Sequence, residues 1–141
     1  MRKDSLALML VLGVFGCGEK PPTSAPAAEG ASGKTPIEVP EFAVSESPAD
    51  VQKGEEIFAG KGCVACHKVG GGKLVGPDLK GVLSRRDETW VKKMIMRPDV
   101  MVKEDETARK LLAEHLTPMP NQGVDGSAEL PYLMAYLKSA R

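Results

Sequence analysis

Two thiols and an imidazole stand close together in the run Cys63-Val64-Ala65-Cys66-His67. This Cys-x-x-Cys-His spacing is the attachment signature of a c-type haem. The two sulfurs would add to the two vinyl groups of the porphyrin, and the tether would bring the next side chain under the ring. His67 would then ligate the iron from one side. The motif therefore predicts one covalently attached haem, held by Cys63 and Cys66.

Three other interpretations of these cysteines are weaker. A zinc site would need a second pair of Cys or His ligands at short spacing, but the third cysteine, Cys17, lies far upstream. A thioredoxin-like Cys-x-x-Cys would sit in a βαβ pattern, which the sequence lacks. A chance pair of core cysteines would leave the adjacent His67 unexplained.

The second axial position of the iron decides what a bound haem can do. The downstream candidates are Met94, Met96, Met101, His115, Met119 and Met134. Met119 is favoured because Pro118 and Pro120 hold it in an extended segment, which can press a thioether against a flat ring with little entropy left to lose. His115 is the main rival, although it falls on the apolar stripe of an expected helix. A thioether would favour ferrous iron and raise the reduction potential.

The first part of the chain is typical of an export and anchoring sequence. Arg2 and Lys3 precede an apolar run over residues 6–15, which suits a signal peptide and is short for a membrane span. The run ends in Val14-Phe15-Gly16-Cys17, which resembles the bacterial lipobox. We therefore expect residues 1–16 to be a lipoprotein signal peptide and Cys17 to carry lipid at the periplasmic face of a bacterial membrane. Cleavage nearby beside an incidental cysteine is the alternative.

Residues 17–47 are rich in Pro, Ala, Gly, Ser and Thr and predict a flexible linker, followed by one domain at 48–141. Ser47-Pro48-Ala49-Asp50 predicts the start of a helix, with a capping residue, a proline in the first turn and an early acid. Further helices are expected from Asp87 to Arg97, over residues 103–116, and beyond Gly126 with Pro131 in the first turn. The run Gly70-Gly71-Gly72 predicts a flexible loop. Since no stretch alternates as a strand would, the domain is predicted to be all-α.

Composition narrows the choice of partner. A chain of 141 residues allows one domain. The formal net charge is zero, which argues against a nucleic-acid partner. Aromatic residues make up only 4% of the chain, so a large flat ligand could supply bulk to the core.

Taken in order, these motifs resemble a class I, mitochondrial-type cytochrome c over residues 48–141. Gly54 and Phe58 match positions of the family's N-terminal helix that pack against an aromatic of the C-terminal helix, here Tyr136. The resemblance implies four to five helices wrapped around one covalent haem. Residues 98–117, with their acidic helix, are longer than the smallest bacterial members need, so the lower edge of the haem may be covered in another way.

The same resemblance implies roles around the iron. Gly76-Pro77-Asp78-Leu79 matches the family's turn, in which the carbonyl of the proline accepts the Nδ1 proton of the ligand histidine and so orients the ring. Met119-Pro120 matches the distal ligand. Three residues fall where the family places donors near a haem propionate: Arg85, Arg86 and Trp90. A solvated arginine pair and a core tryptophan is the alternative for these three.

The predicted function is electron transport by a one-electron carrier that is not an enzyme. The expected partners are a respiratory donor and a terminal oxidase or reductase, with a copper enzyme suggested by similarity to small cytochromes that serve copper reductases and oxidases. One alternative is a haem subunit of a larger oxidoreductase complex. Another is a haem sensor or peroxidase-like protein with a labile sixth ligand, for which His115 would be the distal acid–base group.

Overall fold

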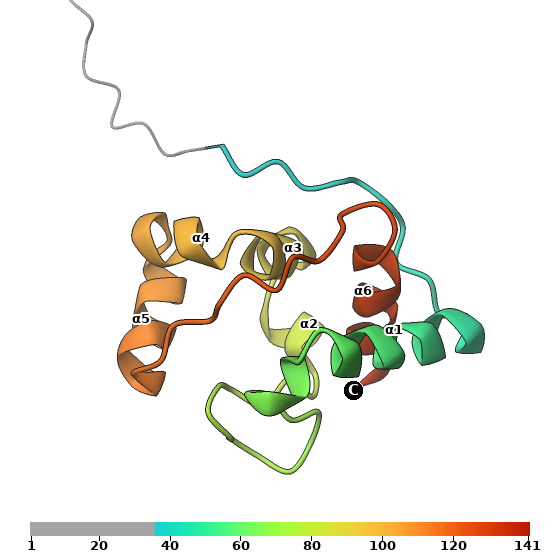
Figure 1. The fold of residues 1–141 in the computed structure, drawn as a ribbon, viewed down its shortest axis with the longest axis horizontal. Helices are drawn as coiled ribbons and strands as arrows, with labels where there is room; N and C mark the ends of the chain where they lie inside the picture. The colour runs from blue at the N-terminus through green and yellow to red at the C-terminus, as the bar shows by residue number, and fades with distance from the viewer. Residues whose placement is uncertain (1–35) are drawn as a thin grey trace, which may run out of the picture. The chain divides into compact units, whose positions relative to one another are not determined.

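The computed structural model describes residues 36–141, and this part of the chain is helical without strands (Figure 1). Its elements are α1 (Pro48–Gly60), the short 3₁₀ turn η1 (Cys63–Ala65), α2 (Val82–Arg85), α3 (Glu88–Met96), α4 (Pro98–Glu104), α5 (Glu106–His115) and α6 (Leu130–Ser139). The predicted all-α class is confirmed. None of the described helices is long and apolar enough to cross a membrane. The predicted signal peptide and Cys17 lie outside the described residues.

Helices α1 and α6 lie in close contact (Figure 1), and Gly54 of α1 is the point of closest approach to Tyr132 and Tyr136 of α6. A Cβ atom at Gly54 would overlap the carbonyl oxygen of Tyr132 and would lie 2.7 Å from Cβ of Tyr136. One turn later, the rings of Phe58 and Tyr136 pack with centroids 5.4 Å apart and planes tilted by 51°. The missing side chain therefore lets the two backbones approach, and the aromatic pair then fixes how they cross.

The N-terminal ends of three helices follow from residues close to them in the sequence. Pro48 occupies the first turn of α1, as Pro131 does in α6. Asp87 caps α3 by accepting a hydrogen bond from the backbone N–H of Trp90 at 3.0 Å. Ser47 holds the capping position of α1 with an extended backbone, but its side chain makes no capping hydrogen bond.

The expected single helix over residues 103–116 is wrong at its start, because the structure contains two helices in this region. Pro98 opens α4 instead of only ending α3, since its fixed φ suits a first helical turn. Asp105 then adopts an extended conformation and caps α5, accepting from the N–H of Ala108 at 2.8 Å. With the unpredicted short α2, this division brings the described helices to six, against the four to five expected.

The core gathers around α6, whose Leu130, Leu133, Met134 and Leu137 are buried. The end of the predicted linker lies against this core, since Phe42 and Val44 pack on it. Lys92 of α3, only 2% exposed, places its ammonium 3.9 Å from the centroid of the Phe42 ring and 2.9 Å from the carboxylate of Glu88. Residues 36–47 therefore have no helix or strand of their own but do make side-chain contacts with the domain.

Candidate functional site

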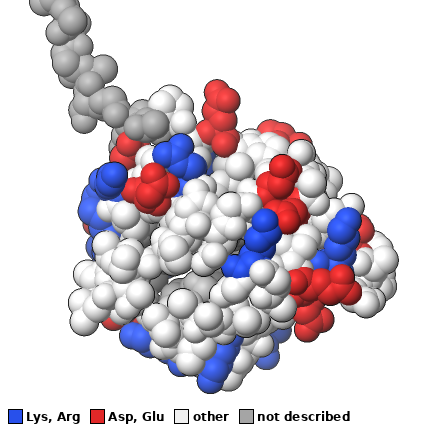
Figure 2. All heavy atoms as spheres, in the orientation of Figure 1, with Lys and Arg blue, Asp and Glu red and all other residues white. Residues whose placement is uncertain are grey.

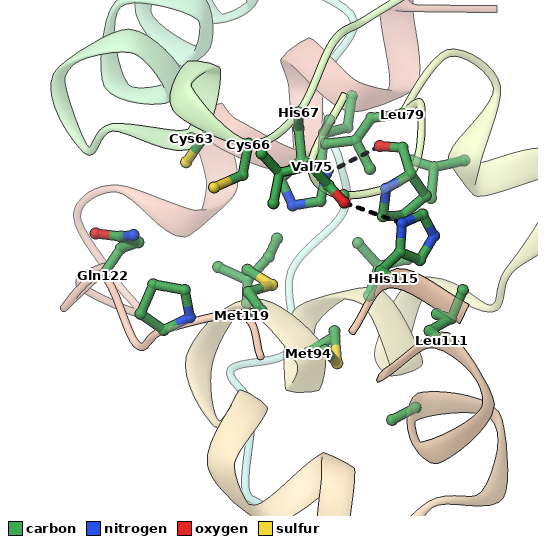
Figure 3. A pocket seen from close by; sticks show the side chains of 18 of the residues that line it. Cys63, Cys66, His67, Val75, Leu79, Met94, Leu111, His115, Met119 and Gln122 are labelled. Atoms are coloured by element: carbon green, nitrogen blue, oxygen red, sulfur yellow. Dashed lines mark hydrogen bonds between the residues drawn. The ribbon is translucent and has the colours of Figure 1, made fainter. Parts of the chain in front are cut away.

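A largely apolar cavity with about 1430 Å³ of empty space, part of it open to solvent, lies among the described helices. Cys63, Cys66 and His67 line one part of it, and Met119 lines another. Figure 3 shows Met119 across the cavity from His67, with Met94 below it on α3. The fold thus brings the four predicted haem-binding residues to one space, although Met119 is far from the others in the sequence.

The two thiols are presented by a single tight turn. Gly62 enters the turn with φ 74°, a left-handed conformation that suits glycine. The N–H groups of Cys66 and His67 then both donate to the carbonyl of Cys63, at 3.1 and 2.9 Å. Cys63 and Cys66 form no disulfide with each other, and burial raises the pKa of the Cys63 thiol. The turn places two sulfurs and an imidazole on the cavity, as the attachment of a haem requires.

His67 is held by backbone on one side. Its Nδ1 donates a hydrogen bond to the carbonyl oxygen of Pro77 at 2.9 Å, since a carbonyl can only accept. The other ring nitrogen is thereby left as a lone-pair donor, and Figure 3 shows it directed into the cavity. A Cβ at Gly76 would lie 2.9 Å from His67 Nδ1, so the glycine makes room for the ring. This is the arrangement by which a carbonyl orients a metal-binding histidine.

Asp78 organises the loop that carries Pro77, a role that the sequence analysis missed. Its carboxylate accepts from the N–H groups of Gly70 and Lys80, both at 2.8 Å, and of Gly72 at 2.7 Å. These donors hold the pKa of Asp78 below its usual range, with the N–H of Lys80 contributing most. The glycines at 70–72 have φ near 90°, a conformation that other residues rarely adopt, and the hydrogen bonds to Asp78 hold the backbone in it. The interpretation as a merely flexible loop is therefore incomplete.

Met119 lies in a non-helical segment between α5 and α6. Asn121 anchors this segment by donating to the carbonyl of Met96 at 2.9 Å and by accepting from the N–H of Gly123 at 2.8 Å. Lys61, at the end of α1, donates to the carbonyl of Gly123 at 3.0 Å and pairs with Glu129 at 2.7 Å. The thioether is thus carried by a non-helical segment that is anchored at its C-terminal end by Asn121 and Lys61.

The other candidate ligands divide into two groups. Met94 and His115 line the same cavity as Met119. Met101 and Met134 are buried among other side chains, and a Cβ at Gly126 would lie 3.0 Å from Cε of Met96. His115 lies at the end of α5, where its Nδ1 donates to the carbonyl of Val75 at 3.1 Å. The sequence offered His115 as the rival ligand, and the structure places it on the cavity wall beside Met94 and Met119.

The residues expected near a propionate all line the cavity, but their donors are partly occupied. The indole N–H of Trp90 donates to Asp105 at 3.1 Å, so Trp90 offers the cavity an apolar ring and no free donor. Arg85 donates to the backbone carbonyls of Asp78, at 3.0 Å, and Lys80. Arg86 stacks over Trp90, with its guanidinium carbon 5.6 Å from the ring centroid. The structure therefore disfavours Trp90 as a hydrogen-bonding partner of a propionate.

The extra residues 98–117 form a wall of the cavity. Their contribution is mainly apolar and comes from α4 and α5: Val102, Ala108, Leu111, Leu112 and His115. Asp105 links this wall to α3. Its carboxylate caps α5 by accepting from the N–H of Ala108 and also accepts a hydrogen bond from the indole N–H of Trp90. Residues 98–117 thus supply apolar surface that a flat cofactor can contact.

The donor set fits a haem better than a lone metal ion. The described residues contain no group of three or more Cys, His, Asp or Glu side chains that could hold an ion. Two thiols at the edge, an oriented imidazole, a facing thioether and apolar walls match the needs of a covalently bound haem. Cys63 and Cys66 would hold its edge, while His67 and Met119 would approach its two faces.

Comparison with known proteins agrees with this geometry. The family model described as cytochrome c matches residues 51–141. A cytochrome c from Rhodothermus marinus superposes with a TM-score of 0.67 at 22% identity, covering 76% of this chain and 90% of its own. The cytochrome c domain of a Pseudomonas putida protein gives 0.54 at 35% identity, covering 61% of this chain and 85% of that domain. Members of the matched family carry covalently bound haem c and transfer electrons. The chain belongs to the cytochrome c family.

Proposed function

We propose that this protein is a periplasmic one-electron carrier whose iron keeps His67 and Met119 as its two axial ligands. The observation that carries the proposal is the position of Met119 across the cavity from His67, with Cys63 and Cys66 at the cavity edge (Figure 3). Two protein ligands leave no axial position for substrate, which favours a carrier over an enzyme. Because neither ligand has to leave when the electron arrives, little of the structure must reorganise.

The bound haem supplies the iron(II)/iron(III) couple, and the protein sets where and how readily it operates. Pro77 holds the His67 ring through Nδ1 and raises the basicity of the other nitrogen. The thioether of Met119 is a soft ligand that favours ferrous iron and so raises the potential. The apolar walls from α3, α4 and α5 keep water from the cofactor.

Electron exchange is proposed at the edge held by Cys63 and Cys66. Val64, between the two thiols, is 50% exposed and gives this edge an apolar tip. Figure 2 shows a face of the domain whose centre is hollowed and formed mainly by residues other than Lys, Arg, Asp and Glu, with charged residues of both signs around it. Such a face suits brief contact with another redox protein, with charges at the rim guiding approach. We take a respiratory donor and a terminal oxidase or reductase, such as a copper enzyme, as the partners.

The axial assignment is tested with Met119→Ala. The ferric wild-type protein should show a sulfur-to-iron charge-transfer band at the red end of the spectrum, and the variant should lose it. The reduced variant should bind carbon monoxide, and its reduction potential should fall because the soft ligand is gone.

Met94→Leu is the matched control, since Met94 lines the same cavity and the exchange nearly conserves volume. It should keep the band and exclude carbon monoxide. A wild-type protein that lacks the band and binds carbon monoxide readily would refute the carrier and favour the sensor or peroxidase-like alternative.

The membrane location is a separate part of the proposal and rests on the sequence around Cys17. Lipid on Cys17 would anchor the domain at the periplasmic face of a bacterial membrane and let it swing between partners on its linker. Cys17→Ser should release the protein into the soluble periplasmic fraction with its haem still attached. Unchanged association with membranes would discard the lipid anchor.

A further inference from the structure

The segment that carries Met119 has few hydrogen bonds of its own. Within the described part of the chain, residues 117–120 make none, and Pro118 and Pro120 have no N–H to donate. Figure 3 shows Gln122 on the Cys63 side of Met119, so the segment runs from the thioether toward the edge of the cavity that carries the thiols. How firmly the thioether is held therefore depends on what fastens the segment on that side.

Two hydrogen bonds tie this side of the segment to distant parts of the chain. The amide of Asn121 donates to the carbonyl of Met96 at 2.9 Å, and the ammonium of Lys61 donates to the carbonyl of Gly123 at 3.0 Å. Lys61 directly follows α1 and stands shortly before Cys63 in the sequence. It therefore links the turn that presents the thiols to the segment that presents the thioether.

The ammonium of Lys61 is itself held in place by Glu129, at the start of α6. Nζ of Lys61 lies 2.7 Å from Oε2 of Glu129, and the same oxygen accepts from the N–H of Asp125 at 2.8 Å. The hydrogen bond from Lys61 does most to keep the pKa of the Glu129 carboxyl below its usual range. Both side chains are 27% exposed, so the pair is partly shielded from solvent. Because a charged donor makes a stronger hydrogen bond than a neutral amide, we expect Lys61 to be the main tie on the segment.

We propose that Lys61 is a positioning residue that sets how readily Met119 leaves the iron of the bound haem. The proposal rests on the axial pair of the proposed function. For the thioether to leave, the segment must move away from the ring, and the carbonyl of Gly123 must then separate from the ammonium. The sulfur keeps its electron pair when the iron–sulfur bond breaks, so no electron is transferred and the oxidation state of the iron is unchanged. Lys61 thus acts on the ligand through the backbone of the segment and does not touch the iron.

The test is the rate at which added imidazole replaces Met119 in the ferric, haem-loaded protein. At high imidazole concentration this rate reaches a plateau, which equals the rate at which the thioether leaves the iron. Lys61→Met removes the ammonium and keeps an unbranched side chain, so the plateau should rise several-fold above that of the wild type. A plateau equal to the wild-type value overturns the proposal.

Two controls separate the tie from a change in charge and from a general loss of stability. Lys53→Met makes the same exchange on α1, where the ammonium lies 3.9 Å from the centroid of the Tyr132 ring. Asp87→Ala removes the cap of α3, whose carboxylate accepts from the N–H of Trp90, and so lowers stability elsewhere in the fold. Both should keep the wild-type plateau. A rise in either control as large as that in Lys61→Met would overturn the proposal.

Glu129→Gln tests the same tie from α6. The ammonium of Lys61 can still donate to Gly123 in this variant, so the plateau should rise less than in Lys61→Met, and a larger rise would assign the hold to Glu129 and overturn the proposal. The charge-transfer band should be present in the wild type and in Lys61→Met before imidazole is added. Its absence from the wild type would refute the axial pair and this inference with it. A band that is present together with an unchanged plateau refutes the role of Lys61 alone.

Discussion

Backbone carbonyls orient both histidines of the cavity. His67 donates to Pro77 and His115 donates to Val75, two residues that lie in the same loop. In each ring Nδ1 is thereby committed as a donor, and in His67 the other nitrogen is left free to face the cavity. Gly76 stands between the two acceptors, and a side chain there would strike the His67 ring. One short loop therefore sets the tautomer of both imidazoles.

Leu116 is strained, and its replacement should stabilise the protein. It ends α5 with φ 54°, a left-handed conformation that costs a side-chain-bearing residue about 1–2 kcal/mol. Its side chain is 85% exposed, so little packing would be lost. Leu116→Gly should raise the free energy of unfolding by roughly 1 kcal/mol, less than the full strain because glycine also frees the unfolded chain. Denaturant unfolding of the haem-loaded protein measures this.

Leu116→Ala is the control for the loss of the leucine side chain. It keeps a Cβ in the same conformation, so it should bring no such gain. A glycine variant no more stable than the alanine variant would show that the left-handed conformation at this position holds no strain that glycine relieves.

Among the elements, the loop at residues 70–80 depends on one carboxylate. Asp78 accepts N–H bonds on both of its oxygens, and an asparagine could accept on only one. Asp78→Asn should therefore speed amide hydrogen exchange at Gly70, Gly72 and Lys80, and should loosen the seat of His67. Ser139, outside this loop, should exchange at its wild-type rate. Unchanged exchange at all three loop amides would remove Asp78 from this role.

The same carboxylate predicts a pH dependence. The loop N–H groups lower the pKa of Asp78 in the folded protein, and the N–H of Lys80 has the largest effect. The stabilisation that the Asp78 carboxylate gives to the folded loop is therefore fully present above the ordinary pKa of an aspartate. That contribution is lost as pH falls through the depressed pKa of the folded protein. Exchange of the loop amides in the wild-type protein should therefore accelerate on acidification beyond intrinsic chemistry, and Asp78→Asn should lack this component.

Within the molecule as a whole, residues 36–47 are fastened to the domain by a few contacts. Phe42 lies under the buried ammonium of Lys92, and Glu46 pairs with Lys138 at 3.0 Å. Phe42→Ala should remove packing and a cation–π contact, costing roughly 1–3 kcal/mol, and should expose this segment to protease. Limited proteolysis should then cut residues 36–47 several-fold faster.

The absorption spectrum of the Phe42→Ala protein should stay unchanged, since none of these contacts involves a haem ligand. Glu41→Ala, at an exposed neighbour, should leave cleavage at the wild-type rate. Equal cleavage of the wild-type and Phe42→Ala proteins would show that the segment is held by something else.

Short-range chemistry allowed much of this protein to be predicted from its sequence. Cys63, Cys66 and His67 are adjacent, so their spacing alone indicates haem attachment. Pro48, Asp87 and Pro131 act within one helical turn, and the starts of α1, α3 and α6 were predicted correctly. The start of α5 was not, because Pro98 is compatible both with ending one helix and with beginning the next.

Tertiary structure decided what depends on residues far apart in the sequence. Met119 could be singled out by its flanking prolines, but only the fold places it across from His67. The carboxylate of Asp78 meets the loop glycines, Trp90 gives its N–H to Asp105, and His115 reaches Val75 across 40 positions. No periodicity encodes these pairs, since each depends on where two segments meet after helices have packed. The spacing in the sequence thus indicated which residues attach and ligate the cofactor, and the packing of the helices decided which side chains line the cavity around it.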